Sequence, residues 1–341
     1  MKKVCVEYIW IDAFDNTRSK LKVIDFDDNY LVSLNDFTEW NFDGSSTGQA
    51  EGRDSDVLIR PVSMYNNPFI NWCESYLVMC DCYNKDGTPH ITNYRIKCKE
   101  TASKCEDAES LFGIEQEYIL FGRNKLPYKW LGYEEPGNGA QGPYYCGTGG
   151  DRTFGREISL KHLEYCLKAG LKICGTNGEV MPSQWEFQIG PIGPLEVSDQ
   201  LWVARYILQR VCEDYDCIAS FHPKPYKGDW NGSGGHTNFS TKYMRENGGI
   251  HEIIKACQKL EITHKEHMKV YGRFNDERLT GFHETSSIDD FSWGISNRGC
   301  SIRIPLNVNK EGCGYLEDRR PAANLDPYLV THKIMESVVL S

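Results

Sequence analysis

The first part of the chain alternates hydrophobic and polar residues in the manner of β-strands. Strand-like runs such as "VEYIWIDA", "SKLKVIDF" and "ESYLVMCDCYN" fill residues 4 to about 92, and turn signals such as Asp-Gly separate them. This pattern predicts a small β-rich domain over residues 1–90. Its polar segment 41–56, "NFDGSSTGQAEGRDSD", is longer than a hairpin turn, and loops of that length in compact domains are usually functional or disordered.

Beyond residue 93, helical and strand patterns alternate, which predicts a second, larger domain over residues 93–341. The helical period predicts helices over 157–170, 197–215 and 251–272. Shorter apolar runs predict strands over 113–121, 173–180, 184–189, 218–221, 236–240 and 300–304. A glycine-rich stretch, residues 134–151, predicts a long loop.

Two acids within one predicted strand raise an electrostatic problem. In "FGIEQEY", residues 112–118, successive side chains point to opposite faces, so Glu115 and Glu117 share one face and Gln116 lies on the other. Like charges roughly 7 Å apart repel each other unless a positive group lies between them. Acids gathered in this way suit a cation.

Further ionisable residues stand beside turns and within apolar surroundings. They are Glu179 in "GTNGEVMP", Glu186 in "QWEFQIGP" and His236 in "NGSGGHTNFS". Glu186 shares a predicted strand face with Gln184 and Gln188, so this segment is either a functional polar face or a solvated sheet surface. The glycines before His236 would let a ligand approach the backbone, but they match neither the P-loop nor the dinucleotide-binding pattern.

Arginines and acids are interleaved toward the carboxyl end. The arginines are Arg278, Arg298, Arg303, Arg319 and Arg320, and the acids among them are Glu284 and Glu317. Because the guanidinium fork suits phosphate and carboxylate, the region is either an anion-binding site or a set of structural ion pairs. The segment "HKEH", residues 264–267, lacks the zinc-binding HExxH spacing and is predicted to be a solvated helix face.

Composition narrows the class of protein. The 341 residues are 40% hydrophobic and 12% aromatic, as in ordinary globular proteins, and the net charge of -10 argues against nucleic-acid and membrane partners. We recognise no signal peptide and no run of the ~20 apolar residues that span a membrane, so we expect a cytoplasmic location. The fourteen cysteines are scattered without a CxxC pair, which predicts reduced, mostly buried thiols.

Several long motifs occur in one order between about residue 7 and residue 332. They include "EWNFDGSSTGQ", "FGIEQEY", "NGEVMPSQWEFQIGP", "HPKPYKGDWNGSGGHTNFSTK", "RLTGFHE", "NRGCSIRIP" and "EDRRPAANLDPY". With these motifs the chain resembles the eukaryotic type of the glutamine synthetase family. The resemblance implies an α+β fold, in which a small N-terminal β-grasp domain precedes a larger catalytic α/β domain with a curved antiparallel sheet flanked by helices.

The implied activity is an ATP-dependent ligase that condenses L-glutamate and ammonia to L-glutamine. It would release ADP and phosphate and proceed through a γ-glutamyl phosphate. The resemblance also implies two divalent cations, Mg²⁺ or Mn²⁺, for which mostly oxygen ligands are suitable. One cation would be held by Glu117, Glu179 and Glu186, and the other by Glu115, His236 and Glu317, which would place the two acids of "FGIEQEY" on different ions.

By the same resemblance, further residues would serve the substrates. The catalytic residues would be Asp43, Glu284, Arg298 and Arg303. Substrate-binding residues would be Ser46, Tyr144, Glu179, Asn231, Gly232, His236, Arg278, Arg298 and Arg319. Nucleotide-binding residues would be Glu186, Pro191, Asn238, Ser240, Arg298, Arg303 and Tyr315.

The resemblance gives several of these residues distinct roles. Asp43 and Ser46 would bind ammonium, and Glu284 would close over the intermediate and take the proton. Tyr144 or its neighbour Tyr145 would line the same pocket. In the family the loop that carries Asp43 completes the active site of the neighbouring subunit within two stacked rings of five, so a homo-decamer is implied.

Two positions depart from the family's pattern. Leu111 stands where relatives commonly carry an aromatic residue beside the adenine, and Leu316 stands where a phenylalanine usually follows the tyrosine. Because loss of a ring weakens stacking, we expect weaker ATP binding than is usual for the family, with the chemistry intact.

Other functions stay open. The scaffold could join a different amine to glutamate and so form a γ-glutamyl amide, although the intact "FDGSS" loop favours ammonium. A structural or regulatory relative without turnover is the non-catalytic alternative, but the metal and arginine positions are all filled. A glycosidase that uses Glu115 and Glu117 is disfavoured, because the additional carboxylates and arginines suit metals better.

Overall fold

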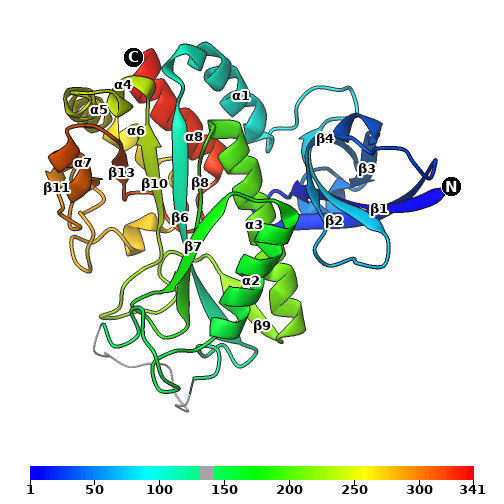
Figure 1. The fold of residues 1–341 in the computed structure, drawn as a ribbon, viewed down its shortest axis with the longest axis horizontal. Helices are drawn as coiled ribbons and strands as arrows, with labels where there is room; N and C mark the ends of the chain where they lie inside the picture. Colours follow the sequence, from blue (N-terminus) through cyan, green and yellow to red (C-terminus); the bar gives the residue numbers. More distant parts are fainter. Residues whose placement is uncertain (131–141) are drawn as a thin grey trace.

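The computed structural model describes residues 1–130 and 142–341, and its first part is a five-stranded sheet (Figure 1). The strands are β1 (Lys2–Ile11), β2 (Thr17–Phe26), β3 (Trp40–Asp43), β4 (Asp56–Asn66) and β5 (Glu74–Tyr83), in the order β2-β1-β5-β4-β3. β1 and β5 are parallel and the other neighbours antiparallel. Val4, Val6 and Tyr8 of β1 are fully buried in the core of this sheet, while Ile9 on the other face joins the larger core that follows.

A longer second part follows. Its strands are β6 (Leu111–Gly122), β7 (Ile173–Gly178), β8 (Gln184–Ile192), β9 (Cys217–Ser220), β10 (Gly235–Ser240), β11 (Trp293–Ile295), β12 (Ile302–Ile304) and β13 (Leu316–Asp318). Its α-helices are α1 (Tyr94–Lys104), α2 (Arg156–Ala169), α3 (Pro194–Asp214), α4 (Lys242–Arg245), α5 (Ile250–Ile262), α6 (His264–Met268), α7 (Leu306–Glu311) and α8 (Pro327–Met335). Short turns of other helix types occur in both parts. The first part contains η1 (Leu34–Asp36) and η2 (Gly44–Thr47), and the second contains η3 (Glu106–Ala108), η4 (Asn275–Glu277) and η5 (Glu336–Leu340).

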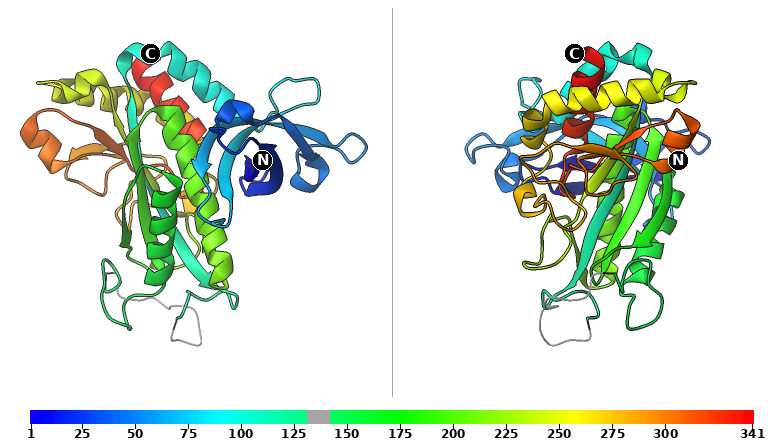
Figure 2. Two further views of the ribbon diagram at one scale, coloured as in Figure 1. Left: turned by 45° about the vertical axis from the view of Figure 1, so that its right-hand side comes forward. Right: turned by 90° about the vertical axis from the view of Figure 1, so that its left-hand side faces the viewer.

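The strands of the second part form one eight-stranded sheet. Its order is β11-β12-β13-β10-β6-β8-β7, with β9 paired to β6 beside that path. All its pairs are antiparallel except β11 with β12, so the sheet is mixed rather than purely antiparallel as we expected. Helices α2, α3 and α8 lie on the side of the long strands that faces the N-terminal sheet (Figure 2). One face of the long sheet is therefore covered by helices.

The alternation in β6 divides its side chains between the two faces. Gln116 is fully buried on the helix-covered face, where its Oε1 accepts hydrogen bonds of 2.9 and 2.6 Å from Nε and Nη2 of Arg205 on α3. Glu115 and Glu117 therefore point to the opposite face, as the sequence predicts.

The helix predicted over 251–272 is interrupted. α5 ends at Ile262, and the separate short helix α6 contains "HKEH". The prediction that this segment is a solvated face was wrong for its two histidines, because His264 is 5% exposed and His267 is fully buried, while Lys265 and Glu266 are exposed. His264 Nε2 lies 2.8 Å from the carbonyl of Ile288, and His267 lies 2.5 Å from the hydroxyl of Tyr271. Such partners satisfy the ring nitrogens within the core.

The sheets and helices enclose most of the thiols. All fourteen cysteines are free in the structure, and most of them are buried, as predicted. Residues 134–141 of the predicted glycine-rich loop lie outside the described residues, and residues 142–151 contain no helix or strand.

A buried histidine on α2 predicts how stability depends on pH. Burial lowers the pKa of His162 to about 4, so the unfolded chain binds more protons than the folded chain between that pKa and its ordinary value of 6.5. Stability is therefore lost as the pH falls through this window. We expect His162→Gln, which cannot titrate, to reduce the loss of unfolding free energy between pH 7 and pH 5 by about 2 kcal/mol in urea unfolding.

The matched control is the exposed His251 on α5. His251→Gln should leave the pH dependence of the wild type unchanged. A His162→Gln variant with the full wild-type loss at pH 5 would contradict the assignment of this acid sensitivity to His162.

Candidate active site

The register of the long sheet places the predicted acids beside one another. Glu115 on β6 is directly opposite His236 on β10, and Glu117 on β6 is directly opposite Glu186 on β8. Opposed residues have Cβ atoms about 5 Å apart and share one face. Hydrogen bonding between three strands therefore gathers three carboxylates and an imidazole on the face that the helices leave open.

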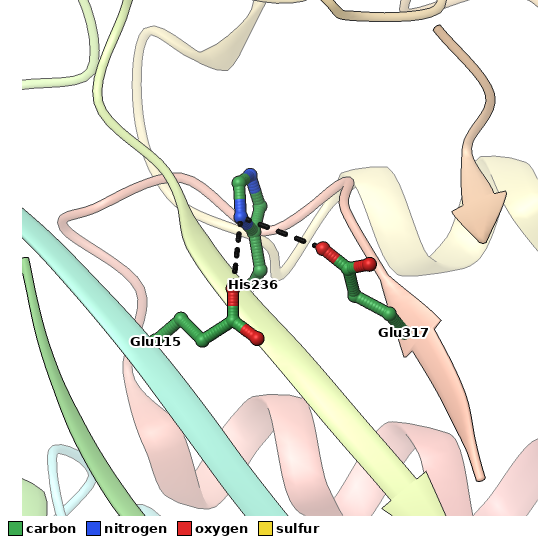
Figure 3. A group of neighbouring side chains, drawn as sticks. All are labelled: Glu115, His236 and Glu317. Carbon is green, nitrogen blue, oxygen red and sulfur yellow. Dashed lines mark ion pairs between the residues drawn. The ribbon is translucent and has the colours of Figure 1, made fainter. Parts of the chain in front are cut away.

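Glu317 joins this group from β13. Its Oε1 lies 3.8 Å from Nδ1 of His236, and the same nitrogen lies 3.5 Å from Oε2 of Glu115 (Figure 3). Figure 3 shows the two carboxylates directed at one nitrogen of the ring from β6 and β13. The three side chains offer ligand atoms within 4.8 Å of one another. They are the set that the resemblance assigns to one cation.

The structure brings only some of the predicted ligands of the second cation close together. Glu117, Glu186 and His236 offer ligand atoms within 4.8 Å of one another, whereas Glu179 does not belong to this group among the described residues. Glu179 lines the same cavity and accepts a hydrogen bond of 3.0 Å from Asn177. In this arrangement His236 lies between the two sets of carboxylates.

Burial and mutual repulsion set the protonation of this cluster. Burial, together with neighbouring carboxylates, raises the pKa of Glu117 to about 7, that of Glu179 to about 8 and that of Glu186 to about 9. The pKa of His236 is lowered well below 6.5, first by burial and then by the nearby arginines. The imidazole is therefore neutral, and the acids lack enough positive charge to be fully ionised together.

Arginines border the acids on the β12 and β13 side. Arg303 Nε and Arg319 Nη1 both donate to the carboxylate of Glu317, the second at 2.8 Å. Arg319 Nε also donates to the carbonyl of Arg298 at 3.0 Å. Arg278 is buried and donates to the carbonyls of Arg319 and Arg320 at 2.9 and 3.3 Å, neither of which carries a full charge. Burial lowers the pKa of Arg278 to about 10, so an anionic ligand would stabilise its buried positive charge.

These groups surround a cavity of about 770 Å³. That volume is within the range of sites for cofactors and small molecules. Thirteen of the predicted residues line it: Glu115, Glu117, Glu179, Glu186, Asn231, Gly232, His236, Arg278, Glu284, Arg298, Arg303, Glu317 and Arg319. The sequence motifs thus converge on one cavity from strands and loops far apart in the chain.

Four of the predicted nucleotide residues are not among those that line the cavity, and they lie in or next to the strands that carry its acids and imidazole. Asn238 is two residues after His236 on the same face of β10 and donates to Glu115 at 2.8 Å. Ser240 follows on that face, and its hydroxyl donates to Gly314 O at 2.6 Å. Pro191 is near the end of β8, and Tyr315 directly precedes β13. Leu111 is opposite Ser240 in the β6 and β10 register, so it lies beside these residues.

Sequence reasoning left Tyr144 and Tyr145 as alternatives, and the structure separates them. Tyr145 lines the cavity. Tyr144 packs instead against Trp130 and Phe154, with ring centroids 6.4 Å from each, and lines a small neighbouring space. The geometry therefore favours Tyr145 as the tyrosine that contacts a bound substrate.

Asp43 and Ser46 do not line the cavity of their own chain. They lie at the end of β3 and in η2 of the N-terminal sheet, where both are exposed. Asp43 accepts hydrogen bonds from the backbone and side chain of Ser45 and from Ser46, which lower its pKa to about 2. A fixed, ionised carboxylate on an exposed loop is suited to a cation on another surface.

Several residues that line the cavity were not predicted. Gln188 was noticed only as a polar neighbour of Glu186, and Asn177, His283 and Thr285 were not singled out. The position of His283 next to Glu284 was the available signal. Asn177 lies within the strand predicted over 173–180 and offered no sequence signal of its own.

None of the helices within the described residues has both the length and the apolar character needed to cross a membrane.

The fold and the site have the donor groups expected of an enzyme that uses divalent cations and anionic substrates. The open face of a large sheet gathers carboxylates, a neutral imidazole and arginines around one cavity. The sequence models of the glutamine synthetase β-grasp domain and catalytic domain match residues 2–85 and 94–340, so the chain belongs to the glutamine synthetase family. This result confirms the family and the α+β fold predicted from the motifs.

Individual relatives agree with this assignment. The glutamine synthetase of Debaryomyces hansenii is 52% identical over 338 residues, which are 98% of this chain and 89% of that protein. That of Saccharomyces cerevisiae is 51% identical over 338 residues, with the same coverage of 98% and 89%. A cryo-EM structure of Plasmodium falciparum glutamine synthetase has the same fold, with a TM-score of 0.76 at 18% identity over 99% of this chain and 71% of that chain.

Proposed function

We propose that this chain condenses L-glutamate and ammonia to L-glutamine, with conversion of ATP to ADP and phosphate through a γ-glutamyl phosphate. The observation that carries the proposal is the single cavity in which carboxylates, a neutral imidazole and arginines converge, in a chain of the glutamine synthetase family. The test is phosphate release with glutamate, ammonium and ATP, each omitted in turn. Release that is indifferent to glutamate would overturn the proposal.

The donor set fits divalent cations. Carboxylate oxygens and one neutral imidazole lie within 4.8 Å of one another, and the raised pKa values of the buried acids show that positive charge is lacking. We propose that Glu115, His236 and Glu317 hold one ion and that Glu117, Glu179 and Glu186 hold the other. When bound, Mg²⁺ or Mn²⁺ would neutralise the acids and the nucleotide phosphates.

The arginines support the binding of two anionic substrates. We assign Arg278 and Arg319 to the carboxylates of glutamate, with Asn231 and Gly232 at its amino-acid end. Arg298 and Arg303 are assigned to the transferred phosphoryl group, because such transfer depends on positioning and charge stabilisation more than on protein nucleophiles. The nucleotide would lie against the edge formed by Pro191, Asn238, Ser240 and Tyr315.

Glu284 is the proposed base for ammonium. It lines the cavity on a loop between η4 and β11, and its carboxylate would take the proton once the loop is closed over the intermediate. Asp43 and Ser46 are the proposed ammonium-binding residues. Because they lie outside the cavity of their own chain, we propose that they complete the site of a neighbouring subunit, in a homo-decamer of two rings of five. Mass photometry at the assay concentration tests this assembly.

The absence of disulfide bonds among the fourteen cysteines supports a location in a reducing compartment of the cell. All fourteen cysteines are unpaired, as expected in a reducing compartment. We therefore propose that the enzyme works in the cytoplasm.

The two leucines that depart from the family's pattern lie on different faces. Leu111 is opposite Ser240, on the face of β6 that carries Glu115, whereas Leu316 is fully buried in the core, opposite Phe239. Because Leu316 has no exposed surface, it offers no direct contact to a nucleotide, and we now assign the expected loss of ATP affinity to Leu111. We expect Leu111→Trp to tighten ATP binding about fivefold in calorimetry, the effect of about 1 kcal/mol of aromatic stacking.

Leu316→Phe is the control for this comparison. It should leave ATP affinity unchanged and lower the melting temperature, because a larger ring overpacks a filled core. Equal ATP affinity in the wild type and Leu111→Trp would show that the base does not lie beside Leu111.

A further inference from the structure

The loop that carries Glu284 has a strained backbone. Thr280 and Ser287 form an antiparallel bridge, and within it Thr285 N donates to Phe282 O at 3.3 Å, which closes a tight turn. The two central residues, His283 and Glu284, both have positive φ values, 55° and 60°. Positive φ at both centres is the pattern of a type I′ turn, which favours asparagine and glycine. Histidine and glutamate hold it only if other contacts offset the cost.

One of these contacts comes from inside the cavity. Arg319 Nη2 donates to the backbone carbonyl of Glu284 at 3.3 Å. The same arginine binds Glu317 and the carbonyl of Arg298, so it is itself fixed by the site. This contact couples the Glu284 loop to a residue that we assign to glutamate binding.

A second contact holds the loop through His283, which also lines the cavity. His283 Nε2 lies 2.9 Å from Oδ1 of Asp229, with the histidine side chain 23% exposed and the aspartate side chain 69% exposed. Because a carboxylate only accepts hydrogen bonds, Nε2 carries the proton. Asp229 belongs to the connection between β9 and β10, which also supplies Asn231 and Gly232 to the cavity. The pair therefore joins two loops that line one cavity.

We propose that the pair of His283 and Asp229 is a clasp that keeps the Glu284 loop closed over the reaction centre and excludes water from it. The proposal rests on the function proposed above, since water matters only if a hydrolysable intermediate forms. His283 and Asp229 are positioning residues here. The clasp holds the strained turn whose next residue is the proposed base.

Loss of the clasp has a defined chemical consequence. Water that enters the open site attacks the γ-carbonyl carbon of γ-glutamyl phosphate, the bond from that carbon to the phosphate oxygen breaks, and phosphate leaves while the water's proton passes to solvent. Glutamate is regenerated, so ATP is consumed without glutamine. The signature is phosphate released in excess of glutamine, which general destabilisation of the fold would not produce.

The experiment uses Asp229→Ala in the full chain, with phosphate and glutamine measured in the same reaction. An exposed ion pair contributes modestly, so we expect the excess phosphate to rise about two- to fivefold and glutamine formation to fall by a similar factor. Asp229→Asn is the conservative variant. Its amide oxygen still accepts from Nε2, and it should restore coupling close to that of the wild type.

A matched control removes a different exposed aspartate. Asp25 pairs with Lys3 at 2.7 Å on the N-terminal sheet, so Asp25→Ala removes one charge and one surface ion pair away from the cavity. It should couple phosphate to glutamine as the wild type does. Unchanged coupling in Asp229→Ala would overturn the clasp, and so would equal uncoupling in Asp229→Ala and Asp229→Asn. Failure of the wild type to form glutamine would instead overturn the proposed function, so the two failures are distinguishable.

Discussion

Replacing Glu117 by glutamine is expected to lower glutamine formation about a thousandfold, a loss of about 4 kcal/mol of transition-state stabilisation. Oε2 of Glu117 accepts hydrogen bonds from Gly234 N at 2.8 Å and from Gln184 Nε2 at 3.3 Å, and Oε1 lies 4.0 Å from His236 Nδ1. Two donors would hold the amide oxygen in the place of Oε2. The amide NH₂ would then point into the carboxylate cluster, where a donor cannot ligate a cation.

Stability should change in the opposite direction. Glu117→Gln removes a buried carboxylate beside Glu115 and Glu186, so its melting temperature in chelator should equal or exceed that of the wild type. The rise in melting temperature on addition of Mg²⁺ should shrink. Glu109→Gln is the matched control, because Glu109 is exposed and pairs with Lys242 at 2.9 Å. A Glu117→Gln enzyme that keeps a tenth of the wild-type activity would contradict the assigned role.

Replacing Glu284 by glutamine is expected to lower ammonium-dependent turnover by about a hundred- to a thousandfold at neutral pH, the contribution of a positioned general base. The amide is nearly isosteric and keeps the turn, but it cannot take a proton. Hydroxylamine is a weaker base than ammonia and is largely unprotonated at neutral pH. Glu284→Gln should therefore retain most of its rate when hydroxylamine replaces ammonium and the γ-glutamyl hydroxamate is measured.

The comparison between the two amines is the internal control. Equal losses with ammonium and hydroxylamine would show that Glu284 positions the substrate rather than removing a proton. Measuring phosphate and product in the same reaction also separates loss of the base from loss of the clasp. Asp229→Ala should release phosphate in excess of product, whereas Glu284→Gln should fail mainly at deprotonation.

Much of the fold could be predicted from local pattern. The long helices α2 and α3 lie within a few residues of their predicted ranges, and β6 and β10 coincide with predicted strands, because each has enough residues to show its period. β11 and β13 were missed, since three residues are too few to show an alternation, and β12, of the same length, was found only as part of the longer predicted strand 300–304. The burial of the two histidines of "HKEH" was missed because their partners, such as Ile288 and Ser337, are distant in sequence.

The candidate site, too, has features that the sequence predicts and features that depend on the tertiary structure. The types of residue, their order in the motifs and the sharing of one face by Glu115 and Glu117 follow from the sequence, because strand alternation is a local property. The sequence does not determine which acids share a cation position. The structure groups His236 with Glu117 and Glu186 as well as with Glu115 and Glu317, which depends on the register between separate strands.

The sequence by itself determined the family, the two acids facing one way on β6, and the chemistry of carboxylates, imidazole and arginines. Only the tertiary structure decided that Tyr145 rather than Tyr144 faces the cavity, that Leu316 lies in the core, and that His283 reaches Asp229. The physical reason is that residue type and local period act through neighbours in the chain. Register, burial and loop contacts join residues far apart in the chain, and these appear only when the sheet is assembled.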